Sequence, residues 1–482
     1  MGKLKRLAGD TVLYGLGSIF PKFLNFLMVP LHTSIFLPAE YGVITYLYSY
    51  VTFINVIFMF GMETSYFRFA TKPGADEKKI FNLAQTVVVG ISLILSVVII
   101  GFASPIANAL DIEGKSNFII WMVVILFIDA VVAIPFARLR LQKRPLQFAL
   151  GKIINILILV GLNWYFLTFL YDASIGVAYV FIANLAANAF YILFFAKTLI
   201  SWRPAYEKEI SSSMFSYGYP IMITGLAGMT NENFSRLTLK WWLPENFYPG
   251  RTSEFALGVF SACYKFSVIM NLVVIAFRYA AEPFFFSNAS DKNSPQLFAK
   301  VNHYFVIVCC VILLGVSTNL DILKYFLRRE EYWEGLSIVP ILLLGYLFLG
   351  VYYNMSVWFK LIDKTYYGTI ITFGGAIITF AANYVLIPQF GYVGSSWATF
   401  MCYFSMTVAC YFFGQKFYPI PYRVLKDVGY ILVASFLVYG TNQVIIDNQW
   451  LATGFHGLVL MTFILIAFII ERKELTSTSG SK

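Results

Sequence analysis

Fourteen long apolar stretches follow one another along the chain and leave room for little else. They are bounded by charged or turn-forming residues, and most approach or exceed the ~20 apolar residues that a helix needs to cross a bilayer. Because a backbone inside hydrocarbon must satisfy its own hydrogen bonds, these stretches are predicted to be helices. We therefore expect an all-α polytopic membrane protein with about 14 transmembrane helices. The stretches are 11–35, 41–66, 81–103, 118–137, 146–170, 175–200, 214–238, 255–287, 298–318, 336–358, 366–386, 391–413, 424–446 and 452–470.

The composition supports this interpretation. Hydrophobic residues make up 59% of the 482 positions and charged residues only 12%, whereas soluble domains carry about 25% charged residues. A soluble enzyme, a disordered protein and a nucleic-acid-binding protein are therefore excluded. The formal net charge of +10 is assigned to loops at the membrane surface.

Motifs for catalysis or for cofactor binding are missing from the sequence. Its five cysteines all fall in apolar stretches without metal-ligand spacing, and its three histidines are scattered. There is no Gly-rich phosphate loop, no zinc-binding His-Glu-x-x-His and no Ser nucleophile elbow. We therefore predict that the protein is not an enzyme and has no cofactor and no metal site.

Lys and Arg are distributed unevenly between the two sides of the predicted bundle. The segments on the side of the N-terminus hold 24 of these residues, and the segments on the opposite side hold 6. Since cytoplasmic loops of membrane proteins carry an excess of Lys and Arg, both termini are predicted to be cytoplasmic.

An internal repeat divides the predicted helices into two sets. When the second and eighth predicted helices are aligned at an offset of 216 residues, Gly42 is aligned with Gly258. Gly176 falls on Gly394 at an offset of 218, between the sixth and twelfth helices. These matches predict two parallel, pseudo-symmetric six-helix bundles around a central cavity, followed by two extra helices. The predicted parts are an N-terminal bundle (1–210), a C-terminal bundle (211–415) and two extra helices with a cytoplasmic tail (416–482).

Three segments carry a resemblance to a known family. They are GDTVLYGLGSIFPKFLNFLMVPLHTSIFLPAEYGVITYLYSYV near the N-terminus, LGVFSACYKFS at the eighth predicted helix and FGYVGSSWATFMCYFS at the twelfth. With the Glu40-Tyr41-Gly42 turn, they resemble bacterial polysaccharide-biosynthesis exporters. These exporters include the O-antigen and lipid-linked oligosaccharide flippases of the multidrug/oligosaccharidyl-lipid/polysaccharide exporter superfamily.

The resemblance implies a multi-pass protein of the inner (cytoplasmic) membrane, with two six-helix halves that form a V. It also implies that an undecaprenyl-diphosphate-linked oligosaccharide, such as an O-antigen unit of lipopolysaccharide, is moved from the cytoplasmic to the outer leaflet by alternating access. Implied partners are that lipid-linked glycan, membrane lipid, and a polysaccharide polymerase with other assembly proteins.

Four basic residues lie within predicted helices, where a charge is costly and usually faces a cavity or a partner. A diphosphate that enters a low-dielectric site needs fixed cations. Given the resemblance, we expect these residues to line the cleft between the halves and to bind the diphosphate. The alternative is snorkelling to an interface or internal pairing. The residues are Lys22, Arg236 and Arg278, with Lys265 as a further candidate.

Two of the acidic residues within the helices lie one helical turn from these cations. Glu232 lies four residues before Arg236, and Glu282 lies four residues after Arg278. This spacing places each pair on one helix face, and we interpret both as pairs that neutralise buried charge.

Three further charged residues lie within the predicted helices. Asp129 is either a proton or cation site or a partner of Lys22. Glu63 is expected to pair with Arg68, and Lys152 is expected to anchor its helix at the cytoplasmic interface.

Two other functions compete with the flippase. A drug or cation antiporter of the same superfamily predicts a cavity dominated by acids, whereas this sequence places several cations in its helices. A membrane polysaccharide polymerase or ligase would need a catalytic loop outside the membrane. The longest candidates, 239–254 and 319–335, are too short for a domain.

A cysteine introduced directly after Ile470 tests the predicted topology. With a cytoplasmic C-terminus, a membrane-impermeant thiol reagent added to intact cells should leave this cysteine unlabelled and should label it once the membrane is opened. The unmodified protein, with its five native cysteines, gives the background. Labelling from outside intact cells would contradict the topology.

Overall fold

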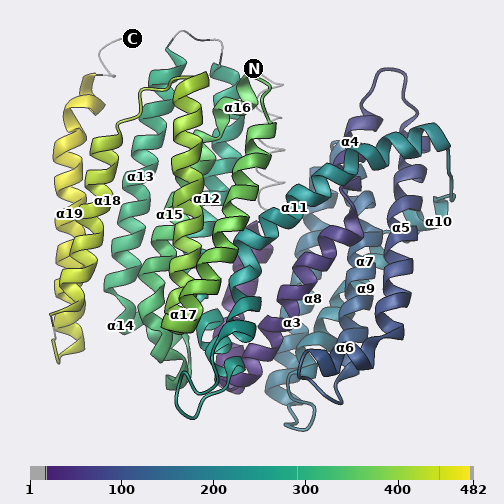
Figure 1. The fold of residues 1–482 in the computed structure, drawn as a ribbon, viewed down its shortest axis with the longest axis horizontal. Coiled ribbons are helices and arrows are strands. Elements are labelled where there is room, and N and C mark those ends of the chain that lie inside the picture. The colour runs from purple at the N-terminus through teal and green to yellow at the C-terminus, as the bar shows by residue number, and fades with distance from the viewer. Residues whose placement is uncertain (1–16, 18, 290, 292, 445, 478–482) are drawn as a thin grey trace. The chain divides into compact units, whose positions relative to one another are not determined.

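The described part of the chain is entirely helical, as the apolar stretches predict. A computed structural model describes all residues except 1–16, 18, 290, 292, 445 and 478–482 (Figure 1), and these described residues contain helices and no strand. The α-helices are α2 (Val29–Ile35), α3 (Pro38–Met59), α4 (Met62–Ala70), α5 (Glu77–Gly101), α6 (Ala103–Ala109), α7 (Ser116–Leu141), α8 (Pro145–Phe169), α9 (Ala178–Phe194), α10 (Ala196–Ser201), α11 (Lys208–Trp242), α12 (Ser253–Asn288), α13 (Ser294–Thr318), α14 (Leu320–Leu323), α15 (Val339–Met355), α16 (Val357–Leu361), α17 (Tyr366–Phe417), α18 (Val424–Asn442) and α19 (Gln449–Ser477). Two 3-10 helices, η1 (Lys324–Phe326) and η2 (Glu330–Ile338), precede α15.

Ten helical segments of the described residues are long and apolar enough to cross a membrane. The first predicted helix begins among residues outside the described part, and α9 is a shorter apolar helix. The two predicted helices 366–386 and 391–413 both lie within α17, which consists of two helices that meet at a kink. The kink follows Pro388 and lies at Gly391, which has φ 57° and ψ −133°, a conformation open chiefly to glycine. Multi-pass helical architecture is confirmed, and the count of fourteen helices stays a prediction.

The chain divides into two compact units, Met1–Leu237 and Thr238–Lys482. In the first unit, α7 packs against both α5 and α9, and α8 packs against α9. One apolar core gathers large side chains of α3, α4 and α5, including Phe58, Tyr66 and Phe81. A second core surrounds Phe136 of α7. These contacts hold the polar side chains of α7, α8 and α9 in fixed register.

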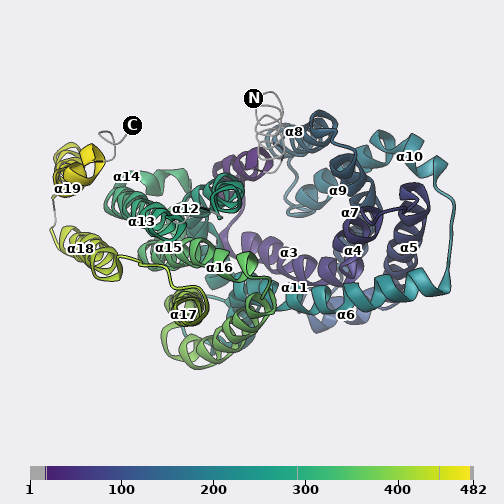
Figure 2. The ribbon, with the colours of Figure 1, turned by 90° about the horizontal axis from the view of Figure 1, so that it is seen from above.

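In the second unit, α15 is the central helix. It packs against α12, α13 and α17, and α13 in turn contacts α18 and α19 (Figures 1 and 2). The two C-terminal helices are thus joined to their unit through α13.

A glycine-to-glycine contact fixes the break between α3 and α4 inside the first unit. Phe60 and Gly61 both have positive φ, so the helix ends there and restarts at Met62. A Cβ on Gly218 of α11 would lie 2.6 Å from the carbonyl oxygen of Phe60. The two backbones therefore touch, and only glycine fits at this point of α11.

Replacing Gly218 with alanine tests this contact. The added Cβ would push the two backbones apart, and we expect Gly218→Ala to lower the free energy of unfolding by about 1–3 kcal/mol. Thermal unfolding of the purified protein in detergent measures this loss. Gly228→Ala on the same helix is the matched control, because no atom lies within 4 Å of its added Cβ. Equal unfolding temperatures for the two variants would contradict the close backbone contact.

Candidate functional site

The four predicted cations lie on three helical segments. Lys22 is exposed in the helical stretch before α2. Arg236 of α11 donates a hydrogen bond of 2.6 Å to Asn233 Oδ1. Lys265 and Arg278 share α12 but lie thirteen residues apart, or about 20 Å along a helix. Since one phosphate cannot span that distance, Lys265 and Arg278 belong to different sites.

Two predicted ion pairs of these segments have different outcomes. Arg278 Nε lies 4.0 Å from Glu282 Oε2, so this pair is confirmed as a loose contact. Glu282 makes a closer pair with Lys360 Nζ of α16, at 2.6 Å. Glu232 has an exposed side chain, and Arg236 donates a hydrogen bond to the neighbouring Asn233. Lys360 was missed because the sequence places it in a connection between two helices.

Glu63 forms an ion pair with Arg140 of α7, and the predicted pair with Arg68 is wrong. Arg68 instead places its guanidinium 4.1 Å from the centre of the Tyr217 ring. The physical reason is helical geometry: residues five positions apart on α4 point about 140° away from each other. Glu63 therefore joins α4 to α7.

Asp129 lies in a polar cluster formed by α7, α8 and α9. Its Oδ1 accepts a hydrogen bond of 3.2 Å from Asn188 Nδ2, and Asn188 Oδ1 accepts one of 3.2 Å from Asn155 Nδ2. The positive charge of Lys152 of α8 also acts on Asp129, although the two side chains form no ion pair within 4.0 Å. One acid and two amides are thus linked by hydrogen bonds inside the first unit, with a lysine nearby.

Lys152 points into the first unit and does not act as the expected interfacial anchor. Its ammonium lies 4.1 Å from the ring centre of Phe136 and 5.0 Å from that of Tyr191. Aromatic faces stabilise a cation that has left bulk water. A lysine held in this way near a carboxylate is a suitable group for binding or releasing a proton. The spacing of Lys152 and Asn155 on one helix was the available sequence signal.

A second buried polar cluster joins the C-terminal helices to α13. His303 is 0% exposed, and its Nδ1 lies 2.5 Å from Asp427 Oδ1 of α18. Its Nε2 lies 3.3 Å from Glu471 Oε1 of α19. No sequence pattern indicates this cluster, because its members lie more than 40 positions apart and one is a scattered histidine.

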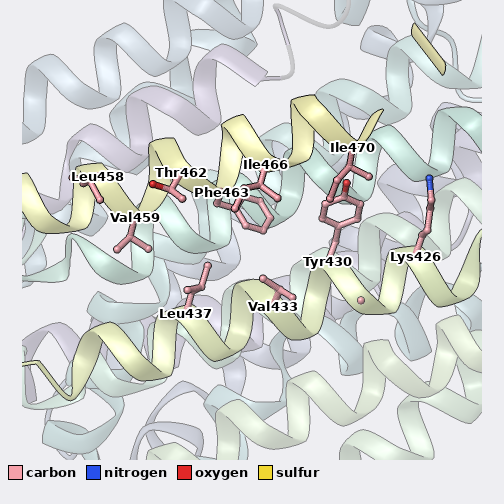
Figure 3. A pocket seen from close by; sticks show the side chains of 11 residues that line it. Lys426, Tyr430, Val433, Leu437, Leu458, Val459, Thr462, Phe463, Ile466 and Ile470 are labelled. Atoms are coloured by element: carbon pink, nitrogen blue, oxygen red, sulfur yellow. The ribbon is translucent and has the colours of Figure 1, made fainter. Parts of the chain in front are cut away.

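An apolar groove lies between α18 and α19 (Figure 3). Its volume is about 530 Å³, and Lys426 lies at one end of it. The lining is otherwise almost wholly apolar, as expected for a surface that faces lipid. It consists of Gly429, Tyr430, Val433 and Leu437 of α18 and Leu458, Val459, Thr462, Phe463, Ile466 and Ile470 of α19.

Solved structures with the same fold are membrane transporters and flippases. The structure is similar to that of the lipid II flippase MurJ in an inward closed conformation, with a TM-score of 0.75, 13% identity, and coverage of 96% of this chain and 100% of that chain. It is also similar to an inward-facing multidrug resistance MATE family transporter of the MOP superfamily, with a TM-score of 0.60, 15% identity, and coverage of 90% and 98%. An outward-facing MATE structure gives a TM-score of 0.56 at 14% identity, with coverage of 90% and 96%.

The chain therefore has the fold of these proteins, and its long apolar helices make it a polytopic membrane protein. The sequence profile described as "Polysaccharide biosynthesis protein" matches residues 34–313, which is more than half of the chain. The chain belongs to this family of polysaccharide biosynthesis proteins. No curated protein sequence matches it significantly.

The charge pair of the first unit can be tested by a double-mutant cycle. Asp129→Asn and Lys152→Gln each leave one charge without its opposite inside the unit, so each should lower the unfolding temperature. The double variant should lose less stability than the two single variants lose together. The difference, the coupling free energy, should be about 0.5–3 kcal/mol. Asp129→Asn combined with Lys197→Gln, an exposed lysine of α10, is the control and should be additive. Additivity in both cycles would show that Asp129 and Lys152 do not interact.

Proposed function

We propose that this protein is a flippase for an undecaprenyl-diphosphate-linked oligosaccharide, an O-antigen or other surface polysaccharide unit. It would move this lipid from the cytoplasmic to the outer leaflet of the inner membrane by alternating access. The observation that carries the proposal is the family match over residues 34–313. The fold similarity to a lipid II flippase supports it, because lipid II is itself a lipid-linked glycan.

The chemistry of the substrate explains why cations are needed inside the membrane. A diphosphate loses its hydration when it enters a low-dielectric site, and charge-assisted hydrogen bonds must replace that hydration. Arg236 and Arg278 can each donate hydrogen bonds to two phosphate oxygens, while Lys22 acts as a point charge. We propose that these three residues contact the diphosphate, with Lys265 elsewhere along the substrate path. No covalent step is required, so the protein is proposed to act without catalysis.

A drug or cation antiporter is the second candidate. The similarity to MATE transporters favours it, as does the half-buried Asp129, which is hydrogen-bonded to Asn188 and through it to Asn155. In either case Asp129 and Lys152 are the residues that we propose for proton or cation coupling. The flippase is preferred because the family match concerns polysaccharide biosynthesis and the helices carry several cations.

Reconstitution in vesicles decides between the two. Purified protein is placed in vesicles that contain a fluorescent undecaprenyl-diphosphate glycan in one leaflet, and transfer to the other leaflet is followed by quenching. The flippase predicts transfer of this lipid and no gradient-driven uptake of a cationic drug. Drug uptake without lipid transfer would replace the proposal with the antiporter.

Loss of one phosphate contact should slow transport without unfolding the protein. We expect Lys22→Gln, Arg236→Gln and Arg278→Gln each to weaken substrate binding roughly ten- to hundredfold, from a loss of about 1.5–3 kcal/mol. Arg236→Lys should recover only part of the activity if the contact is bidentate. Lys78→Gln, at an exposed lysine near the start of α5, is the matched control. Normal transport by all three Gln variants would exclude them as phosphate ligands.

A further inference from the structure

A small polar cavity lies where α12, α15 and α16 meet in the second unit. Its volume is about 20 Å³, close to the space of a single oxygen-sized group. Arg278 and Glu282 of α12, Tyr353 and Asn354 of α15, and Lys360 of α16 contribute to its lining. By the predicted topology, this end of the unit faces the cytoplasm.

Asn354 lines this cavity and carries a hydrogen-bond donor that no described neighbour uses. Its side chain is only 5% exposed, and its Nδ2 has no hydrogen-bond partner among the described residues. Buried amide groups are almost always hydrogen-bonded, because an unpaired one loses its water without replacement. The unpaired Nδ2 therefore indicates that an acceptor group belongs in the cavity.

The charges around the cavity favour an anion. Arg278 and Lys360 bring two positive charges, and Glu282 brings one negative charge. Tyr353 fixes the arginine, because the guanidinium lies 4.5 Å from the centre of its ring. A guanidinium stacked in this way still directs its N–H groups outward in its own plane, where they can meet an acceptor.

Glu282 occupies the position that a phosphate ligand would need. Its Oε1 accepts from Lys360 Nζ at 2.6 Å, and its Oε2 lies 4.0 Å from Arg278 Nε. Carboxylate and phosphoryl oxygens are equivalent acceptors for these two cations. An incoming phosphoryl group would thus compete with Glu282 for both partners.

We propose that Arg278, Lys360 and Asn354 form the seat of one phosphoryl group of the substrate, and that Glu282 is the internal anion which this group displaces. The proposal rests on the proposed function and adds Lys360, Asn354 and Glu282 to it. The ligand chemistry is a diphosphate, either as the lipid ester or as free pyrophosphate. Release of Glu282 from its two cations is then the first local change that substrate binding causes.

Opposite effects of two neutralising substitutions test the proposal. Pyrophosphate binding to the purified full-length protein is measured by calorimetry in detergent. Lys360→Gln removes a ligand and should weaken binding about tenfold. Asn354→Leu should weaken it severalfold. Glu282→Gln removes the competitor and should strengthen binding severalfold, whereas a purely structural ion pair would make Glu282→Gln neutral or harmful.

Two controls complete the binding experiment. Lys416→Gln, at an exposed lysine of α17 in the same unit, should leave binding unchanged. A short-chain polyprenyl diphosphate should show the same order of variants as pyrophosphate if the seat takes the lipid ester, and the corresponding monophosphate should bind more weakly. No pyrophosphate binding by the unmodified protein, or weaker binding for Glu282→Gln, would overturn the proposal.

The vesicle assay separates this proposal from the proposed function. Transfer of the lipid-linked glycan at the normal rate by Lys360→Gln, Asn354→Leu and Glu282→Gln would leave the flippase intact and refute the seat. The predicted order of pyrophosphate affinities without any lipid transfer would support the seat and refute the flippase.

Discussion

Water is excluded from the hydrocarbon core of a membrane, and this exclusion constrains each charged side chain that lies within that core. A lone charge there loses its hydration, so it must meet an opposite charge, an aromatic face or a ligand. Lys152 has two aromatic rings and the charge of Asp129. Glu282 has Lys360 and Arg278. The positions of these groups show which helices are linked by charge, and the apolar surface does not show this.

The two charge clusters of the second unit have different consequences because their partners differ. His303 is enclosed by Asp427 and Glu471 from two other helices, so its cluster holds α18 and α19 to α13. The cluster at Arg278 contains two cations, one acid and an unpaired amide. The first joins three helices through ion pairs, whereas the second leaves the amide of Asn354 for another acceptor.

The fold alone does not distinguish lipid flippases from drug transporters. MurJ and the MATE transporters share it with this chain at 13–15% identity. Substrate choice must then depend on the few charges in the helices. Cations suit a diphosphate, while a carboxylate among amides suits a proton or a cation. This chain has both kinds of group, which is why the proposed flippase includes a separate coupling pair.

The sequence by itself determined the helical class, the positions of most helices and the contact between Arg278 and Glu282. Hydropathy is summed along one helix, and residues four positions apart share a face, so each of these properties is local. Only the tertiary structure shows which residues interact with Glu63, Lys152 and Lys360. These are Arg140, Asp129 and Glu282, respectively, and each lies on another helix. Such pairs depend on how far each helix is rotated and shifted against its neighbour, and packing between helices sets those quantities. The unpaired amide of Asn354 was likewise invisible in the sequence, because a missing hydrogen bond is a property of the whole packed environment.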